Sequence, residues 1–287
     1  MLESYVASVG RCKTINDINR LHLDLEVGLL PRELGDLVAR VRTEVATLPT
    51  PCARWIARME LLLGLSDLPP QDYASEKLGD ALSLLAVAAP PETRRMRTLV
   101  IGYTGNARRF LLPLPVFLRY CDGERYEFLM LVDRSRHSYL RGVDGVAGDL
   151  PGMIVRVGDV IATRRYRRVV SFGTSSGGLA ALWTAVALGL ERGISIAGAG
   201  PDHIGERGED RVDVEALRSA VAARPGRVPE LLYAFGALNE RDRMKGLAHA
   251  RYLPVTPIEL PGIASHGGFL DLLKRRELRA FLERVLG

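Results

Sequence analysis

The chain has 287 residues, of which 47% are hydrophobic and 25% are charged, an ordinary composition for a globular protein. The formal net charge is +5, and no patch of interleaved basic and aromatic residues accompanies it, so we expect no nucleic-acid partner. No apolar stretch reaches the roughly 18 residues of a membrane span, and Met1–Ser4 does not begin a secretory signal. We therefore expect a cytoplasmic protein without a membrane span.

The three cysteines, Cys12, Cys52 and Cys121, are widely spaced and form no CxxC pair. Such a set is typical of reduced thiols rather than of a disulfide framework or a zinc site. We expect neither a metal nor a cofactor. The sequence does not indicate a particular oligomeric state.

Residues 1–92 contain helical patterns and almost no strand candidates. Apolar side chains recur at three- and four-residue spacing over residues 33–41 and 55–62, as on one face of an amphipathic helix. Prolines interrupt these patterns at Pro51 and in pairs at residues 69–70 and 90–91. We predict a small helical N-terminal segment without β-strands, which packs against the rest of the chain.

From about residue 97 onward, apolar strand candidates alternate with helical patterns, the clearest at Leu179–Leu190 and Val212–Ala223. This alternation predicts right-handed crossovers and a mostly parallel sheet in a three-layer αβα sandwich over residues 93–287. Ligands of such sheets bind beyond the carboxyl ends of the strands. The predicted strands are Thr98–Tyr103, Glu127–Val132, Arg168–Phe172, Gly193–Ala197, Glu230–Phe235 and Thr256–Leu260.

The most informative motif is Gly173-Thr174-Ser175-Ser176-Gly177, between a predicted buried strand and an apolar helix. Glycines two residues either side of the serine permit a turn too tight for larger residues, and such a turn exposes the serine hydroxyl in a strained conformation. The helix that follows directs its N-terminus at the same place, so the Ser176 amide is available to stabilise an oxyanion. The motif predicts that Ser175 is a nucleophile.

A serine nucleophile needs a base, and the base needs a group to orient it. Of the five histidines, His266 follows the last predicted strand, is adjacent to glycines, and precedes the final helix. The orienting acid is expected after the preceding strand, where we choose Asp242, with Glu240 as the alternative. We expect the Ser175 hydroxyl to lie within hydrogen-bonding distance of a His266 nitrogen.

Arginines are concentrated at residues 94–97 and 164–168, each run just before a predicted strand. Such runs are usually solvated ends of helices. The other interpretation is that they attract an anionic substrate, such as a carrier-linked acyl group.

The glycine–serine motif, the acidic loop with Asp242 and the loop Ser265–Gly268 resemble the α/β-hydrolase superfamily over residues 97–287. The resemblance implies the chain order serine, acid, histidine, which this sequence satisfies. The chain also looks like the hydrolase-like proteins encoded among bacterial surface-polysaccharide genes. The resemblance implies a serine hydrolase of the esterase, thioesterase or acyltransferase type, acting on a small or carrier-linked acyl substrate or an acylated sugar.

In this superfamily a loop after an early strand supplies a second oxyanion donor, and the matching residues are Thr104, Gly105 and Asn106. They differ from the His-Gly-Gly-Gly pattern of many lipases. Two other functions stay open. The glycine-rich turns at residues 101–106 and 197–201 are compatible with a nucleotide-binding, glycosyl-transferring fold, although neither completes a phosphate-binding motif. The chain is also compatible with a non-catalytic, hydrolase-like scaffold that binds a partner.

Overall fold

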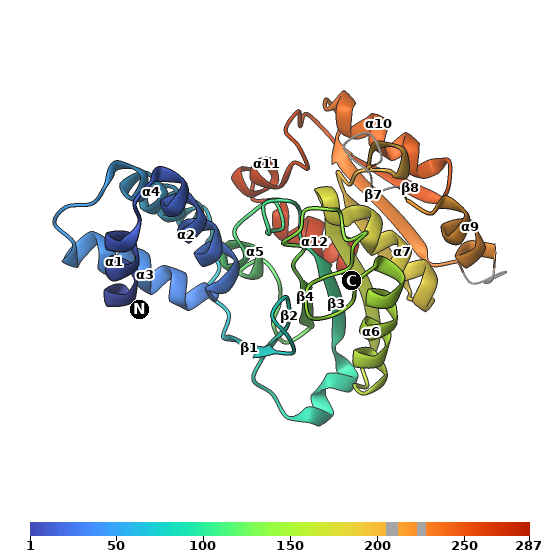
Figure 1. Ribbon diagram of the computed structural model, residues 1–287, viewed down its shortest axis with the longest axis horizontal. Helices are drawn as coiled ribbons and strands as arrows, with labels where there is room; N and C mark the ends of the chain where they lie inside the picture. Colours follow the sequence, from blue (N-terminus) through green and yellow to red (C-terminus); the bar gives the residue numbers. More distant parts are fainter. Residues whose placement is uncertain (205–211, 223–227) are drawn as a thin grey trace.

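A computed structural model describes residues 1–204, 212–222 and 228–287 (Figure 1). Four helices form a lobe beside the sheet, and we call residues 2–64 the helical lobe. Two of these helices begin at a recognisable signal: Thr14 and Asp17 form a reciprocal capping box at α2, and Pro31 is at the start of α3. The helices are α1 (Leu2–Arg11), α2 (Ile15–Gly28), α3 (Pro31–Glu44) and α4 (Thr50–Gly64).

The periodic apolar residues of the lobe form its core, as the sequence predicts. Leu34, Leu37 and Val41 of α3 are buried together with Ile56 and Met59 of α4. The same hydrophobic cluster continues into the α/β domain, so the lobe packs against that domain over an apolar contact.

Eight strands form one sheet in the order β1-β2-β4-β3-β5-β6-β7-β8. The pairs from β4 to β8 are parallel, whereas β1 and β2 are antiparallel to their neighbours. All six predicted strands are present, with ends that differ by at most two residues. The strands are β1 (Tyr73–Lys77), β2 (Leu82–Val87), β3 (Thr98–Tyr103), β4 (Tyr126–Leu131), β5 (Arg168–Thr174), β6 (Arg192–Ile196), β7 (Glu230–Gly236) and β8 (Val255–Leu260).

Two separate hydrophobic clusters cover the faces of the sheet, which makes the architecture a three-layer sandwich. The buried residues of α5, α11 and α12 belong to one cluster, and those of α6, α7 and α9 belong to the other. No helix in the described ranges is long and apolar enough to cross a membrane. The helices are α5 (Leu114–Leu118), α6 (Leu150–Ala162), α7 (Gly178–Leu188), α8 (Pro201–Ile204), α9 (Val214–Ala222), α10 (Glu240–Ala250), α11 (Phe269–Lys274) and α12 (Leu278–Leu286).

The two main helix predictions correspond to α7 and α9. Helix α7 ends two residues before the predicted Leu190, because Gly189 adopts a left-handed conformation (φ 61°) and caps the helix. Helix α9 begins at Val214, and the predicted end at residue 223 lies outside the described residues.

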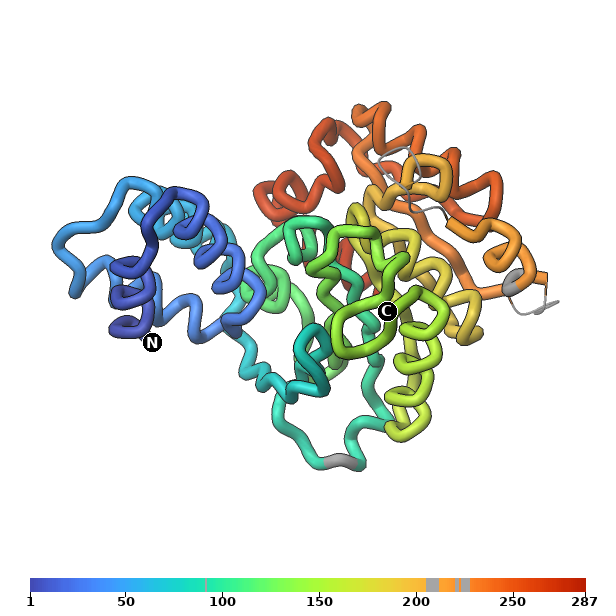
Figure 2. Tube along the Cα trace, viewed as in Figure 1, coloured from blue at the N-terminus to red at the C-terminus, as the bar shows by residue number. Residues whose placement is uncertain are grey.

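The expectation that residues 1–92 contain no β-strand is wrong. β1 and β2 form an antiparallel hairpin at the edge of the sheet, and β2 pairs with β4. The all-helical part therefore ends at Gly64, and Figure 2 shows the chain leaving the lobe for the rest of the molecule well before residue 92. Short apolar runs such as Leu82–Val87 do not distinguish a strand from a helix by periodicity alone.

The arginine runs at residues 94–97 and 164–168 lie just before β3 and β5. They are thus at the amino ends of parallel strands, at the edge opposite the one where ligands bind. Arg97 is not a solvated residue either: it is 4% exposed, and its guanidinium donates to Glu127 at 2.9 Å. Neither interpretation of these runs holds for Arg97, which stabilises the sheet.

Candidate active site

Ser175 lies at the turn between β5 and α7, in a short 3-10 segment (Ser175–Gly177). Its φ is 51°, in the left-handed region that non-glycine residues rarely occupy. Such a conformation costs about 1–3 kcal/mol and persists only where the surroundings impose it. The tight packing around the turn imposes this conformation. A Cβ at Gly173 would overlap the Gly177 carbonyl, and one at Gly177 would overlap the Tyr103 carbonyl.

The candidate base and acid contact each other directly. His266 Nδ1 lies 2.9 Å and 2.8 Å from the two carboxylate oxygens of Asp242. The Asp242 side chain is 1% exposed, whereas the His266 side chain is 42% exposed. The contact fixes the imidazole through one ring nitrogen and leaves Nε2 for another partner.

Asp242, and not Glu240, is the carboxylate that contacts His266. Both lie in the first turn of α10, but Glu240 is exposed, and it makes no contact with His266 in the described part of the chain. Asp242 also accepts a hydrogen bond from the Gly267 amide at 3.2 Å. The helix turns Asp242 inward because the Asn239 side chain caps α10 by accepting from the Asp242 amide at 3.0 Å.

Lys245, which the sequence motifs do not indicate, is a second partner of the same carboxylate. Its Nζ lies 2.8 Å from Asp242 Oδ1, and its side chain is 11% exposed. Burial alone would raise the pKa of Asp242, but the hydrogen bonds from His266 and Lys245 outweigh burial and hold that pKa below its usual value. The spacing of Asp242 and Lys245 in the sequence could have indicated this pair, because residues three apart share one face of a helix.

The loops that carry the acid and the histidine are tied together. The Asn239 side chain donates to the Ala264 carbonyl at 3.0 Å, and the Leu238 amide donates to the Ile263 carbonyl at 2.9 Å. These loops follow β7 and β8, and the serine turn follows β5, so all three are at the carboxyl edge of the parallel sheet.

Ser175 and His266 do not form a hydrogen bond in this structure, counting the described residues only. The expected contact between nucleophile and base is therefore not made. In enzymes without substrate, this particular hydrogen bond is often long or misaligned.

The loop after β3, residues 104–112, lies against the serine turn, and we call it the oxyanion loop. A Cβ added at Gly105 would lie 3.2 Å from Ser175 Cβ. The Thr104 amide donates to Leu131 at 3.3 Å and the Gly105 amide to Arg109 at 3.1 Å, so neither is free for a substrate oxygen. Of the three predicted amides, the Asn106 amide is the one without such a bond within the described residues.

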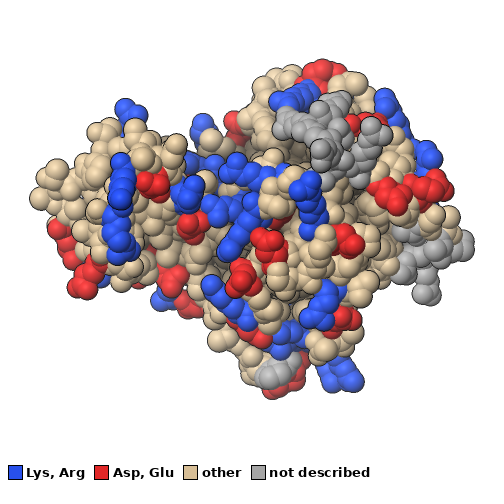
Figure 3. Space-filling model, in the orientation of Figure 1, with Lys and Arg blue, Asp and Glu red and all other residues tan. Residues whose placement is uncertain are grey.

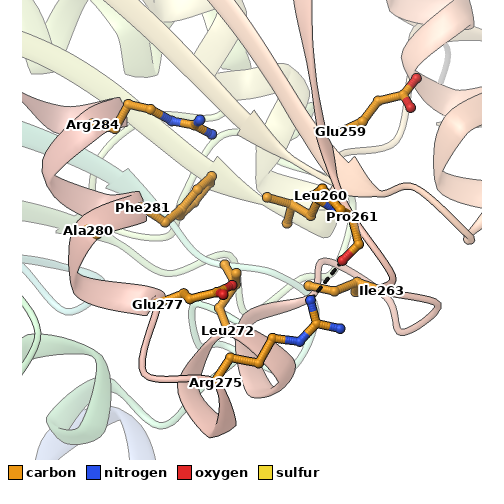
Figure 4. Close-up of a pocket in the computed structure, with 10 residues that line it drawn as sticks. All are labelled: Glu259, Leu260, Pro261, Ile263, Leu272, Arg275, Glu277, Ala280, Phe281 and Arg284. Atoms are coloured by element: carbon orange, nitrogen blue, oxygen red, sulfur yellow. Dashed lines mark hydrogen bonds between the residues drawn. The ribbon is translucent and has the colours of Figure 1, made fainter.

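A cavity of about 290 Å³ lies beside β8, α11 and α12 (Figure 4). Its walls are mainly apolar, with Leu260, Ile263 and Phe281, and none of Ser175, Asp242 and His266 lines it. Arg275 at its edge donates to the Pro261 carbonyl at 2.8 Å. The segment that leads to His266 contributes Pro261 and Ile263 to the lining of this cavity.

The glycine-rich turns of the nucleotide-binding interpretation have a packing role. A Cβ at Gly102 would overlap the Phe110 ring, and one at Gly198 would overlap the Ser195 hydroxyl. Close packing therefore accounts for these glycines without a bound phosphate.

The chain matches no protein-family model, and the curated proteins give no match. Solved structures do resemble it. An ester hydrolase from the metagenome of Lake Arreo aligns with a TM-score of 0.54 and 16% identity over 91% of this chain and 96% of that one. S-formylglutathione hydrolase from Staphylococcus aureus aligns with a TM-score of 0.51 and 14% identity over 71% of this chain and 96% of that one. A hyperthermophilic esterase from Pyrobaculum calidifontis aligns with a TM-score of 0.51 and 12% identity over 89% of this chain and 95% of that one. The chain therefore has the α/β-hydrolase fold, as predicted.

Proposed function

We propose that the protein is a serine hydrolase that cleaves an acyl ester or thioester with Ser175 as nucleophile, His266 as base and Asp242 as orienting acid. The strained φ of Ser175 is the observation that carries the proposal. Backbone strain of this kind is concentrated at functional sites, and the tight glycine contacts maintain it here.

In the proposed reaction, Ser175 Oγ attacks the acyl carbonyl while His266 Nε2 takes the hydroxyl proton. The oxyanion that forms accepts hydrogen bonds from the Ser176 and Asn106 amides. Collapse expels the alcohol or thiol, which receives the proton from His266 and leaves an acyl-enzyme. Water then attacks this ester by the same route and regenerates Ser175. Asp242 holds the proton on Nδ1 and stabilises the imidazolium.

Charge beside the oxyanion loop supports an anionic substrate, such as a carrier-linked acyl group or an acylated acidic sugar. Arg58, Arg108 and Arg109 pair with two carboxylates, Asp24 and Glu26. Three guanidinium groups against two carboxylates leave one positive charge in excess. Arginines suit carboxylate and phosphate groups because they donate hydrogen bonds in a planar fork.

The missing hydrogen bond between Ser175 and His266 favours one other function, a non-catalytic scaffold with a hydrolase fold. Labelling with a fluorophosphonate probe separates the two, because only an activated serine reacts. Wild type should be labelled and Ser175→Ala should not, and hydrolysis of p-nitrophenyl acetate should fall by about 10³-fold or more in the variant. An unlabelled, folded wild type would favour the scaffold. Hydrolysis that persists in Ser175→Ala would show that the nucleophile is another residue.

A further inference from the structure

The oxyanion loop is attached to the helical lobe by two ion pairs from adjacent residues. Arg108 Nη1 lies 2.8 Å from Asp24 Oδ1, and Arg109 Nη1 contacts Glu26 Oε2. Both carboxylates belong to α2. Figure 3 shows Lys and Arg side chains gathered where the lobe meets the α/β domain.

Glu26 is fixed in position and differs from an ordinary surface carboxylate. It is 2% exposed and accepts hydrogen bonds from Trp55 Nε1 at 3.0 Å and from Arg58 Nη1 at 3.3 Å, both on α4. A buried carboxylate with several donors is held in one geometry, and removing a partner leaves a buried charge unpaired. Glu26 thus provides a rigid anchor for Arg109.

The backbone of Arg109 connects this anchor to the catalytic elements. Its carbonyl accepts from the Gly105 amide at 3.1 Å and from the Thr174 hydroxyl at 3.4 Å. Gly105 is next to Asn106, the proposed oxyanion donor, and Thr174 is next to Ser175. One residue therefore joins the lobe, the oxyanion loop and the serine turn.

The conformation of the loop requires such support. Arg108 and Leu111 have φ values of 58° and 63°, in the left-handed region, which is strained for non-glycine residues. A Cβ at Gly267 would overlap the Leu111 side chain, so the loop also contacts the segment next to His266.

We propose that the helical lobe acts on catalysis by holding the oxyanion loop in place, with Glu26 and Arg109 as positioning residues. This inference rests on the proposed hydrolase function. The lobe is then a part of the active-site framework. Loosening Glu26 should displace the Asn106 amide without removing the side chain of Ser175, His266 or Asp242.

The test compares Glu26→Gln with Asp67→Asn. Glutamine retains an acceptor for Trp55 but removes the charge that Arg109 requires. Asp67 pairs with Arg276 at 2.7 Å, also between the segment after α4 and the α/β domain, but it is exposed and distant in the chain from the oxyanion loop. We measure kcat and KM for p-nitrophenyl acetate, the rate of fluorophosphonate labelling and the Tm.

Glu26→Gln should lower kcat and the labelling rate by about 10- to 100-fold with KM nearly unchanged, because a small displacement of an oxyanion donor affects the transition state selectively. Asp67→Asn should match wild type. If Glu26→Gln does not fold, Asp24→Asn, which loosens the exposed end of the same anchor, should lower kcat to a smaller extent.

Three outcomes separate the possibilities. Normal kcat in a folded Glu26→Gln protein, or in Asp24→Asn where Glu26→Gln does not fold, would overturn the inference and leave the hydrolase proposal standing. Equal losses in Glu26→Gln and Asp67→Asn would also overturn it, since they would indicate a general effect of lobe docking. A wild-type protein that neither reacts with the probe nor hydrolyses the ester would instead contradict the proposed function.

Discussion

The two side chains that contact Asp242, His266 and Lys245, predict that its replacement has two separable effects. Asp242→Asn removes the charge that stabilises the His266 imidazolium, so kcat should fall by about 10⁴-fold, as for other triads. It also leaves Lys245 without its anion. The Lys245 side chain is only 11% exposed, so its charge would then be largely desolvated.

Removing one member of a buried ion pair costs about 3–5 kcal/mol, and the remaining exposure of Lys245 favours the lower end, about 3 kcal/mol. At about 2–4 °C per kcal/mol, the Tm should fall by roughly 6–12 °C. Adding Lys245→Met removes the unpaired charge. The double variant should therefore regain stability to within about 1 kcal/mol of wild type.

The assay is a double-mutant cycle that uses the Tm together with hydrolysis of p-nitrophenyl acetate. Lys245→Met alone should keep most activity, because Asp242 retains His266 and the Gly267 amide. The double variant should be stable but as inactive as Asp242→Asn. Activity that returned in the double variant, or a Tm as low as that of Asp242→Asn, would refute the reasoning.

Four further predictions follow from the same geometry. Gly173→Ala should abolish labelling and lower the Tm because its Cβ overlaps the Gly177 carbonyl, whereas the control Gly35→Ala, in an open position on α3, should be neutral or stabilise by up to about 1 kcal/mol. Glu240→Gln should leave kcat unchanged, and a loss of kcat comparable to that of Asp242→Asn would show that Asp242 is the wrong choice of acid. Hydrolysis should be slower in acid than at neutral pH, because only a neutral imidazole can accept the serine proton, and a pH-independent rate would exclude an imidazole base. Burial lowers the pKa of His249 to about 4, so the unfolded chain binds the extra proton between about pH 6.5 and 4. As the pH falls over that range, His249 alone should lower the unfolding free energy by about 3 kcal/mol, and urea titration should show a shallower decline in His249→Leu.

The serine turn and the parallel strands were predictable because their signals are local. A buried strand, two glycines at fixed spacing and an apolar helix specify the turn within a few residues. The strand order then brings the loops after β5, β7 and β8 to one edge, which is why Asp242 and His266 come together as expected. The hairpin β1–β2 was missed for a physical reason. β1 has one buried residue in five, and the Leu and Ala residues of β2 also favour helices.

The contacts between the lobe and the oxyanion loop were not predictable, because nothing local distinguishes the charges that make them. In the sequence, Glu26 is one of several acidic residues on a helix, and Arg109 is one of 39 basic residues. They are 83 positions apart, and their pairing depends on how the lobe packs against the sheet. Packing of an apolar core sets that arrangement, and the arrangement then determines which charges meet. The tight turn at Ser175 is thus predictable from the residues around it, whereas the pairing of Glu26 with Arg109 is set only by the packing of the lobe against the sheet.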